Sequence, residues 1–78
     1  MIEAKYLSAE MVAAIKDVME RYNISRNRLS HKLCMSYITV TTALNRTRKA
    51  TLINVEKFVS FLKEYGVEVE NPVLDDPL

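Results

Sequence analysis

Apolar residues recur at every third or fourth position in several stretches of the chain, a spacing typical of helices with one buried face. The first helix is expected to begin after Ser8, whose hydroxyl can cap it, and to end near Asn23. Its apolar face is formed by Val12, Ile15, Val18 or Met19, and Tyr22. Neither glycine nor proline occurs between Ser8 and Tyr65, so nothing in this region interrupts a series of helices.

Two short helices are expected next. Ser25 can cap a helix that runs to Leu33, and Ser36 can cap another over residues 37–44. Propensity alone would assign the second stretch to a strand, because it is rich in valine and threonine. We favour a helix because a cap precedes it and its inward positions have helical spacing. These inward positions are Val40, Ala43 and Leu44.

A fourth helix is predicted between Thr51, as its cap, and Gly66, which suits a helix end because glycine readily adopts a left-handed backbone. Its buried stripe is expected to contain Leu52, Val55, Phe58, Val59 and Leu62. Phe61 and Tyr65 fall beside this stripe, and we expect them to contact a partner subunit.

The remaining residues, 67–78, form a short acidic tail after a domain over residues 1–66. Val67 and Val69 alternate with glutamates, and we expect them to contact a partner subunit if the tail acts as an arm. A short strand and a disordered end are the alternatives. Ile2, Ala4 and Tyr6 alternate similarly at the other end, so the two ends could also pair, within one chain or between chains.

The charges are distributed unevenly along the chain. The formal net charge is only +1, yet no aspartate or glutamate occurs from Arg21 to Lys49. Seven bases lie in this segment: Arg21, Arg26, Arg28, Lys32, Arg46, Arg48 and Lys49. The rest of the chain has four bases and all ten acids. Such a segment predicts a surface that meets a polyanion, and nucleic acid is the first candidate because each neutralised phosphate releases counterions.

Several other functions are disfavoured by composition. With one cysteine and one histidine among 78 residues, we expect no internal disulfide, no metal site and no cofactor. No apolar stretch is long enough for a membrane span, and the beginning of the chain does not resemble a signal peptide, so a cytoplasmic protein is expected. No clustered catalytic groups or glycine-rich phosphate loop occur, so neither an enzyme nor a small-molecule substrate is expected.

The basic segment contains a pattern typical of two short helices that cross at a steep angle. Ser30 is small where the helices would meet closely, Cys34 occupies the turn, and Met35 is an apolar residue just after it. Ile24 to Val67 resembles the helix-turn-helix domain of the phage repressor and Cro class, the XRE family. The matching run is Leu29-Ser30-x-x-Leu33-Cys34-Met35-Ser36-x-x-x-Val40-x-x-Ala43-Leu44-Asn45-Arg46, followed by Arg48 to Leu52, Val55, Phe58, Leu62 and Gly66-Val67. Cys34, Arg46 and Ala50 depart from it, since the family commonly has Gly, Gly and Pro there.

The resemblance implies an all-α, four-helix repressor-like domain with its helix-turn-helix motif over residues 25–45. It implies a transcriptional regulator that binds double-stranded DNA sequence-specifically, with residues 37–45 in the major groove. A homodimer on a palindromic operator, of phage or prophage type, is the corresponding assembly. The alternative is a helix-turn-helix module, an antitoxin or repressor modulator, that acts mainly through a protein partner.

The resemblance also assigns roles to individual residues. It places Tyr37, Ile38, Thr41 and Thr42 at positions that face base edges. It places Arg26, Ser36, Thr39, Asn45, Arg46, Arg48 and Lys49 at positions near the DNA backbone. Because the reading helix lacks arginine and lysine, we expect readout that favours A·T pairs or DNA shape.

Overall fold

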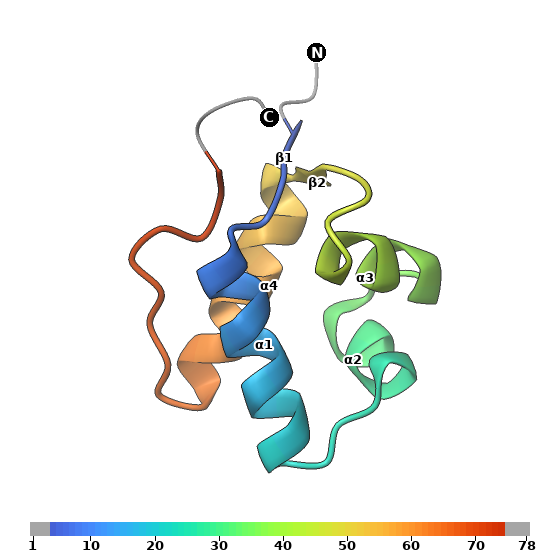
Figure 1. Cartoon of the computed structure of the whole chain (residues 1–78). Helices are drawn as coiled ribbons and strands as arrows, with labels where there is room; N and C mark the ends of the chain where they lie inside the picture. The colour runs from blue at the N-terminus through green and yellow to red at the C-terminus, as the bar shows by residue number, and fades with distance from the viewer. Residues whose placement is uncertain (1–3, 75–78) are drawn as a thin grey trace.

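Four helices and a small two-stranded sheet form the part of the chain that the computed structural model describes, residues 4–74 (Figure 1). The elements follow the order β1 (Ala4–Lys5), α1 (Ala9–Arg21), α2 (Arg26–Leu33), α3 (Tyr37–Leu44), β2 (Ala50–Thr51) and α4 (Leu52–Glu64). The mainly helical fold predicted from the sequence is therefore confirmed, and the sheet is an addition to it.

Each helix begins at the hydroxyl residue predicted to cap it. The Ser8 Oγ accepts a hydrogen bond from the backbone N–H of Met11 at 3.0 Å. Ser25, Ser36 and Thr51 accept in the same way from residues three positions later, at 3.1, 3.1 and 3.3 Å. These bonds satisfy N–H groups that have no partner within the first turn of a helix.

All four helices also end in the same way. Asn23, Cys34, Arg46 and Gly66 have φ of 57°, 56°, 59° and 74°. The N–H of each bonds the carbonyl three residues earlier, and the next N–H bonds the carbonyl five residues earlier. This is the Schellman motif, which stops a helix and turns the chain sharply. Cys34 and Arg46 therefore have a left-handed backbone, a conformation that glycine adopts more readily.

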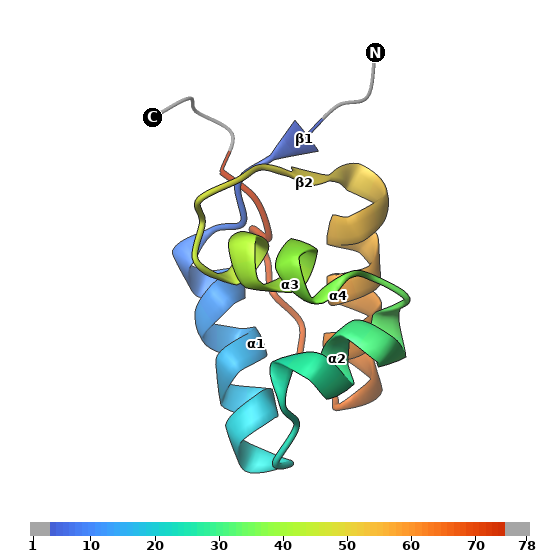
Figure 2. The ribbon, with the colours of Figure 1, turned by 90° about the vertical axis from the view of Figure 1, so that its right-hand side faces the viewer.

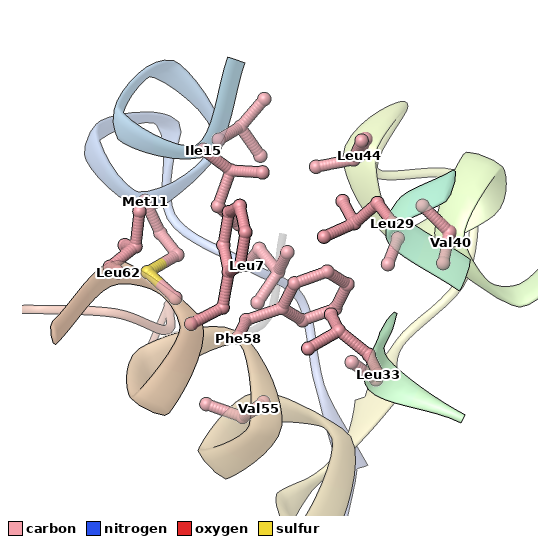
Figure 3. Close-up of a cluster of buried hydrophobic side chains, with 14 of the residues drawn as sticks. Leu7, Met11, Ile15, Leu29, Leu33, Val40, Leu44, Val55, Phe58 and Leu62 are labelled. Atoms are coloured by element: carbon pink, nitrogen blue, oxygen red, sulfur yellow. The ribbon is translucent and has the colours of Figure 1, made fainter. Parts of the chain in front are cut away.

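The core lies between α1 and α4 on one side and α2 and α3 on the other. Met11, Ile15, Leu29, Val40 and Phe58 have no exposed surface. Figure 3 shows Phe58 extending from α4 toward Leu29 of α2. Five apolar side chains from the four helices thus lie in the core, and the apolar area they remove from water stabilises the fold.

The predicted stripe of α4 is partly wrong. Phe61 is buried, with 1% of its surface exposed, because α4 packs against α2 as well as α1 and its buried face is correspondingly wide. Leu52, in the first turn, is 41% exposed, and Val59 is half-buried. Tyr22, assigned to the apolar face of the first helix, is 50% exposed and lies against Tyr65, with 4.5 Å between ring centroids.

The first and last described segments meet within one molecule, but through Leu7 and Val73 and not through the predicted alternation at Val67 and Val69. β1 pairs antiparallel with β2, Ala4 facing Thr51, and Leu7 forms an antiparallel bridge with Val73. The N–H of Ser8 donates to the carbonyl of Pro72 at 3.0 Å. Val67, Val69 and Val73 pack against the core. The tail as far as Leu74 is therefore part of the domain, while Ile2 and residues 75–78 lie outside the described residues.

None of the helices within residues 4–74 has the length and apolar character needed to cross a membrane.

Candidate nucleic-acid interface

α3 lies at the surface, with one face in the core and the other exposed (Figure 2). Val40, Ala43 and Leu44 are buried, with 0%, 3% and 2% of their surfaces exposed. Ile38 points the opposite way and is 68% exposed. Thr42 and Asn45 share this outward side because they follow Ile38 at helical spacing. An exposed isoleucine on a short, otherwise polar helix face is suited to contact with another molecule.

α2 holds α3 in this position through a close crossing. Ser30, the small residue predicted at the crossing, is 4% exposed, and its Oγ donates to the carbonyl of Asn27 at 2.6 Å. Cys34 takes the left-handed turn, and Met35 packs against the core. Both helices are thereby fixed to the core, which leaves the orientation of the exposed α3 face well determined.

The two central threonines of α3 differ in their surroundings. The Thr42 Oγ1 donates to the carbonyl of Ile38 at 2.8 Å, in an exposed hydrogen bond, and lies 3.2 Å from the carbonyl of Thr39. The Thr41 Oγ1 is buried and has no hydrogen-bond partner within residues 4–74. The prediction that Thr41 reads base edges through its hydroxyl therefore conflicts with the structure, since Thr41 lies where α3 turns toward the core. For Thr42, contact with base edges stays a prediction.

The first turn of α3 carries three more of the predicted contact residues. Tyr37 is 50% exposed at the start of the helix. The hydroxyls of Ser36 and Thr39 lie 2.7 Å apart and hydrogen-bond to each other at the surface. These groups form a small cluster of hydroxyl donors and acceptors beside Ile38.

The seven bases of the acid-free segment do not form one surface, contrary to the prediction. Arg21 forms an ion pair with Asp17 at 3.0 Å, one turn earlier in α1. Lys32 forms an ion pair with Glu64 of α4 at 3.2 Å. Acids from other parts of the chain thus neutralise two of the seven bases in the acid-free segment, and the net positive charge around it is smaller than seven. Arg28 faces the two tyrosines at the C-terminal ends of α1 and α4.

Three bases of the acid-free segment line shallow depressions next to α3. Arg48 and Lys49 line a shallow depression together with Ile38 and Thr42 of the exposed α3 face. Arg26, at the start of α2, lines another beside Leu44 at the end of α3. No acidic side chain within residues 4–74 forms an ion pair with these three bases. Positive charge thus borders the exposed face of α3 at Arg48 and Lys49, whereas Arg26 shares its depression with Glu20 of α1.

Arg46 and Lys49 have surroundings that the sequence did not indicate. The Arg46 Nε is buried without a hydrogen-bond partner among the described residues. The Lys49 Nζ lies 5.8 Å from the centroid of the Tyr6 ring, within range of a cation–π interaction. Tyr6 is more than forty positions away along the chain. The β1–β2 pairing, with Lys5 opposite Ala50, brings it to the basic loop, and no local sequence signal predicts so short a pairing.

The four residues expected to contact a partner subunit are used within the chain. Phe61 is buried, and Tyr65 packs on it with 5.2 Å between ring centroids. Val67 and Val69 are partly buried against the core. The assignment of Phe61 as a partner contact is therefore wrong. The other three are largely covered because the tail folds back on the domain.

Comparison with protein-family models, curated proteins and solved structures finds no match to this chain. Within residues 4–74, no group of three or more histidine, cysteine, aspartate or glutamate side chains is arranged to hold a metal ion. The interpretation of the α3 surface consequently depends on its geometry and charge.

Proposed function

We propose that the chain is a helix-turn-helix transcriptional regulator that binds double-stranded DNA with α3 in the major groove. The observation that carries this proposal is the exposed face of α3, which has no acidic side chain and is flanked by bases that have no acidic partner among the described residues. A helix of eight residues is about 12 Å long, and the major groove is about 12 Å wide.

The side chains suggest how the two kinds of contact are divided. Arg48 and Lys49, beside Ile38 and Thr42, suit the phosphates that border a major groove, and Arg26 at the start of α2 is assigned a further phosphate near the end of α3. Ile38 can contact thymine methyl groups, and the Thr42 hydroxyl can hydrogen-bond a base edge. Readout of this kind favours A·T pairs, because α3 has no arginine for the bidentate contact with guanine.

The wider proposal is a cytoplasmic regulator that acts as a homodimer on two half-sites about 34 Å apart, one turn of DNA. One module of this size contacts few base pairs, so two copies give the affinity and specificity that an operator requires.

Selection of binding sites from a pool of random duplexes tests the proposal. We expect an enriched sequence, bound at least about a thousandfold more tightly than a scrambled duplex. Ile38→Ala and Thr42→Ala should each reduce this ratio by roughly tenfold, since one good base contact contributes about 1–3 kcal/mol of discrimination.

Thr41→Val is the matched control in the same helix. It keeps the shape of a side chain whose hydroxyl is buried, so the specificity ratio should not change. A pool without an enriched sequence would contradict the proposal, as would equal losses on selected and scrambled duplexes in the Ile38 and Thr42 variants. Stable complexes with another protein, combined with no DNA binding by the isolated chain, would favour the protein-binding alternative.

A further inference from the structure

An apolar groove runs between the α2–α3 turn and the outer face of α4. Buried Leu33 and Phe61 line it, together with Cys34 and Ser60. Ile53 borders the groove near the start of α4 and is 67% exposed. Ile38 on α3 is exposed to nearly the same extent. Ile53, however, does not belong to the α3 surface that is proposed to bind DNA. The groove and Ile53 together form an apolar patch without a partner among the described residues.

The charged residues around the groove show what can cover it. Lys32 and Glu64 already form an ion pair with each other at 3.2 Å. Glu56 and Lys57, adjacent on α4, form no ion pair within residues 4–74. The patch therefore presents one free acid and one free base side by side, so its charges are complementary to those of an identical patch turned by 180°.

One antiparallel register of two α4 helices satisfies both charge and shape. When Glu56 lies opposite Lys57 of a second copy, two-fold symmetry forms the same pair twice. The same register places Ile53 opposite Ser60, the smallest side chain among those of α4 that line the groove. A large exposed apolar side chain then meets a small one beside the apolar lining of the groove.

We propose that the chain forms a homodimer through the outer face of α4, with Ile53 of each copy seated over Ser60 of the other. The reciprocal Glu56–Lys57 pairs set the antiparallel orientation, and burial of both isoleucines supplies the attraction. The occupant of the groove is thus a second copy of this chain.

The orientation of α3 is compatible with this dimer. A two-fold axis that relates two antiparallel neighbouring helices is perpendicular to both. In Figure 2, α4 runs along one side of the molecule, and α2 and α3 lie in front of α1 and α4. If the two-fold axis of the dimer points along the viewing direction of Figure 2, rotation by 180° about it keeps front-facing surfaces in front. The α3 helices of both copies then lie on the same side of the dimer. The inference thus deepens the proposed function by naming the surface through which two copies would present α3 to one duplex.

Sedimentation equilibrium of the purified full chain, without DNA, tests the dimer. We expect wild type to dimerise and Ile53→Asp to remain monomeric at the same concentrations, with an association constant reduced at least tenfold, a loss of roughly 1.4 kcal/mol or more. Ile38→Asp is the matched control, because it makes the same change at an isoleucine of equal exposure outside the groove. It should still dimerise. Circular dichroism melts verify that each variant is folded.

A charge exchange tests the register. Glu56→Lys and Lys57→Glu should each weaken the dimer, because each opposes like charges across the axis, and the double variant should restore it. A wild type that stays monomeric, an Ile53→Asp variant that still dimerises, or a double variant weaker than both single variants would overturn the inference. The dimer is measured without DNA, so its test is separate from the test of DNA binding. A chain that dimerises through α4 but binds no duplex in the site-selection experiment would support this dimer and contradict the proposed function.

Discussion

Three residues other than glycine have a left-handed backbone within residues 4–74. Asn23, Cys34 and Arg46 end α1, α2 and α3 with φ between 56° and 59°. Asparagine tolerates this conformation better than most residues, whereas cysteine and arginine carry a steric cost between Cβ and the following carbonyl. The cost is tolerated because the paired Schellman hydrogen bonds hold each helix end in place.

Replacing Cys34 by glycine should stabilise the fold. Glycine has no Cβ and adopts φ near 56° without strain, so we expect Cys34→Gly to raise the free energy of unfolding by about 1 kcal/mol. Urea denaturation measures this change. Cys34→Ala keeps the steric cost and removes only the thiol, so it should differ little from wild type. Equal stabilities of the glycine and alanine variants would show that the helix end is not strained.

The structural role of a residue could be predicted from the sequence where a single local interaction determines it. The caps Ser8, Ser25, Ser36 and Thr51 and the terminal Gly66 follow from residue type and spacing, and the structure confirms each. The burial of the Thr41 hydroxyl was not predictable, because periodicity places a residue on the margin of a face without indicating which way its Oγ1 turns.

At the scale of elements, the first cap of the chain differs from the other three. Ser8 is buried, and its Oγ also donates to the carbonyl of Asn71 at 2.6 Å. The same side chain therefore begins α1 and fastens the tail. Ser25, at the start of α2, is exposed and only caps its helix.

We expect Ser8→Ala to cost more stability than Ser25→Ala. Loss of an exposed cap costs about 1 kcal/mol, and loss of the buried bond to the tail adds about 1 kcal/mol. Thermal and urea unfolding of both variants measures the difference, and hydrogen exchange should show faster exchange at Ser8 and Leu74, whose N–H groups bond across the two ends. Identical losses in the two variants would mean that the tail bond contributes nothing.

Elements made by long-range contacts escaped prediction. β1 and β2 are two residues each, too short for an alternating pattern, and they pair across most of the chain. Phe61 was misassigned for a related reason. A stripe read from one helix assumes one neighbouring surface, whereas α4 packs against both α1 and α2.

At the scale of the whole molecule, pairing of charges decides which bases are free to meet phosphate. The Arg21–Asp17 pair is visible in the sequence because the residues are four positions apart on one helix. The Lys32–Glu64 pair is not, because the fold alone brings α2 and α4 together. The position of Arg48 and Lys49 beside the exposed face of α3 likewise depends on the fold.

This division of charge predicts two classes of variant in DNA binding. The double variant Arg48→Ala and Lys49→Ala should flatten the plot of log affinity against log salt by about two units, because each lost phosphate contact removes about 0.9. Arg21→Ala with Lys32→Ala removes the same formal charge from paired positions and should leave the slope nearly unchanged. Fluorescence anisotropy over a salt series measures both slopes. Equal flattening in the two double variants would show that the ion pairs do not withhold their bases from DNA.

The meeting of the two chain ends has a consequence for how the molecule can be rebuilt. The N–H of Leu74 donates to the carbonyl of Tyr6 at 2.9 Å, so the first and last described segments lie side by side. Circular permutation should therefore be tolerated: a short peptide can join the ends, and new ends can be cut at the exposed turn around Asn23. Cyclisation without a cut would restrict the unfolded chain and make the protein harder to denature.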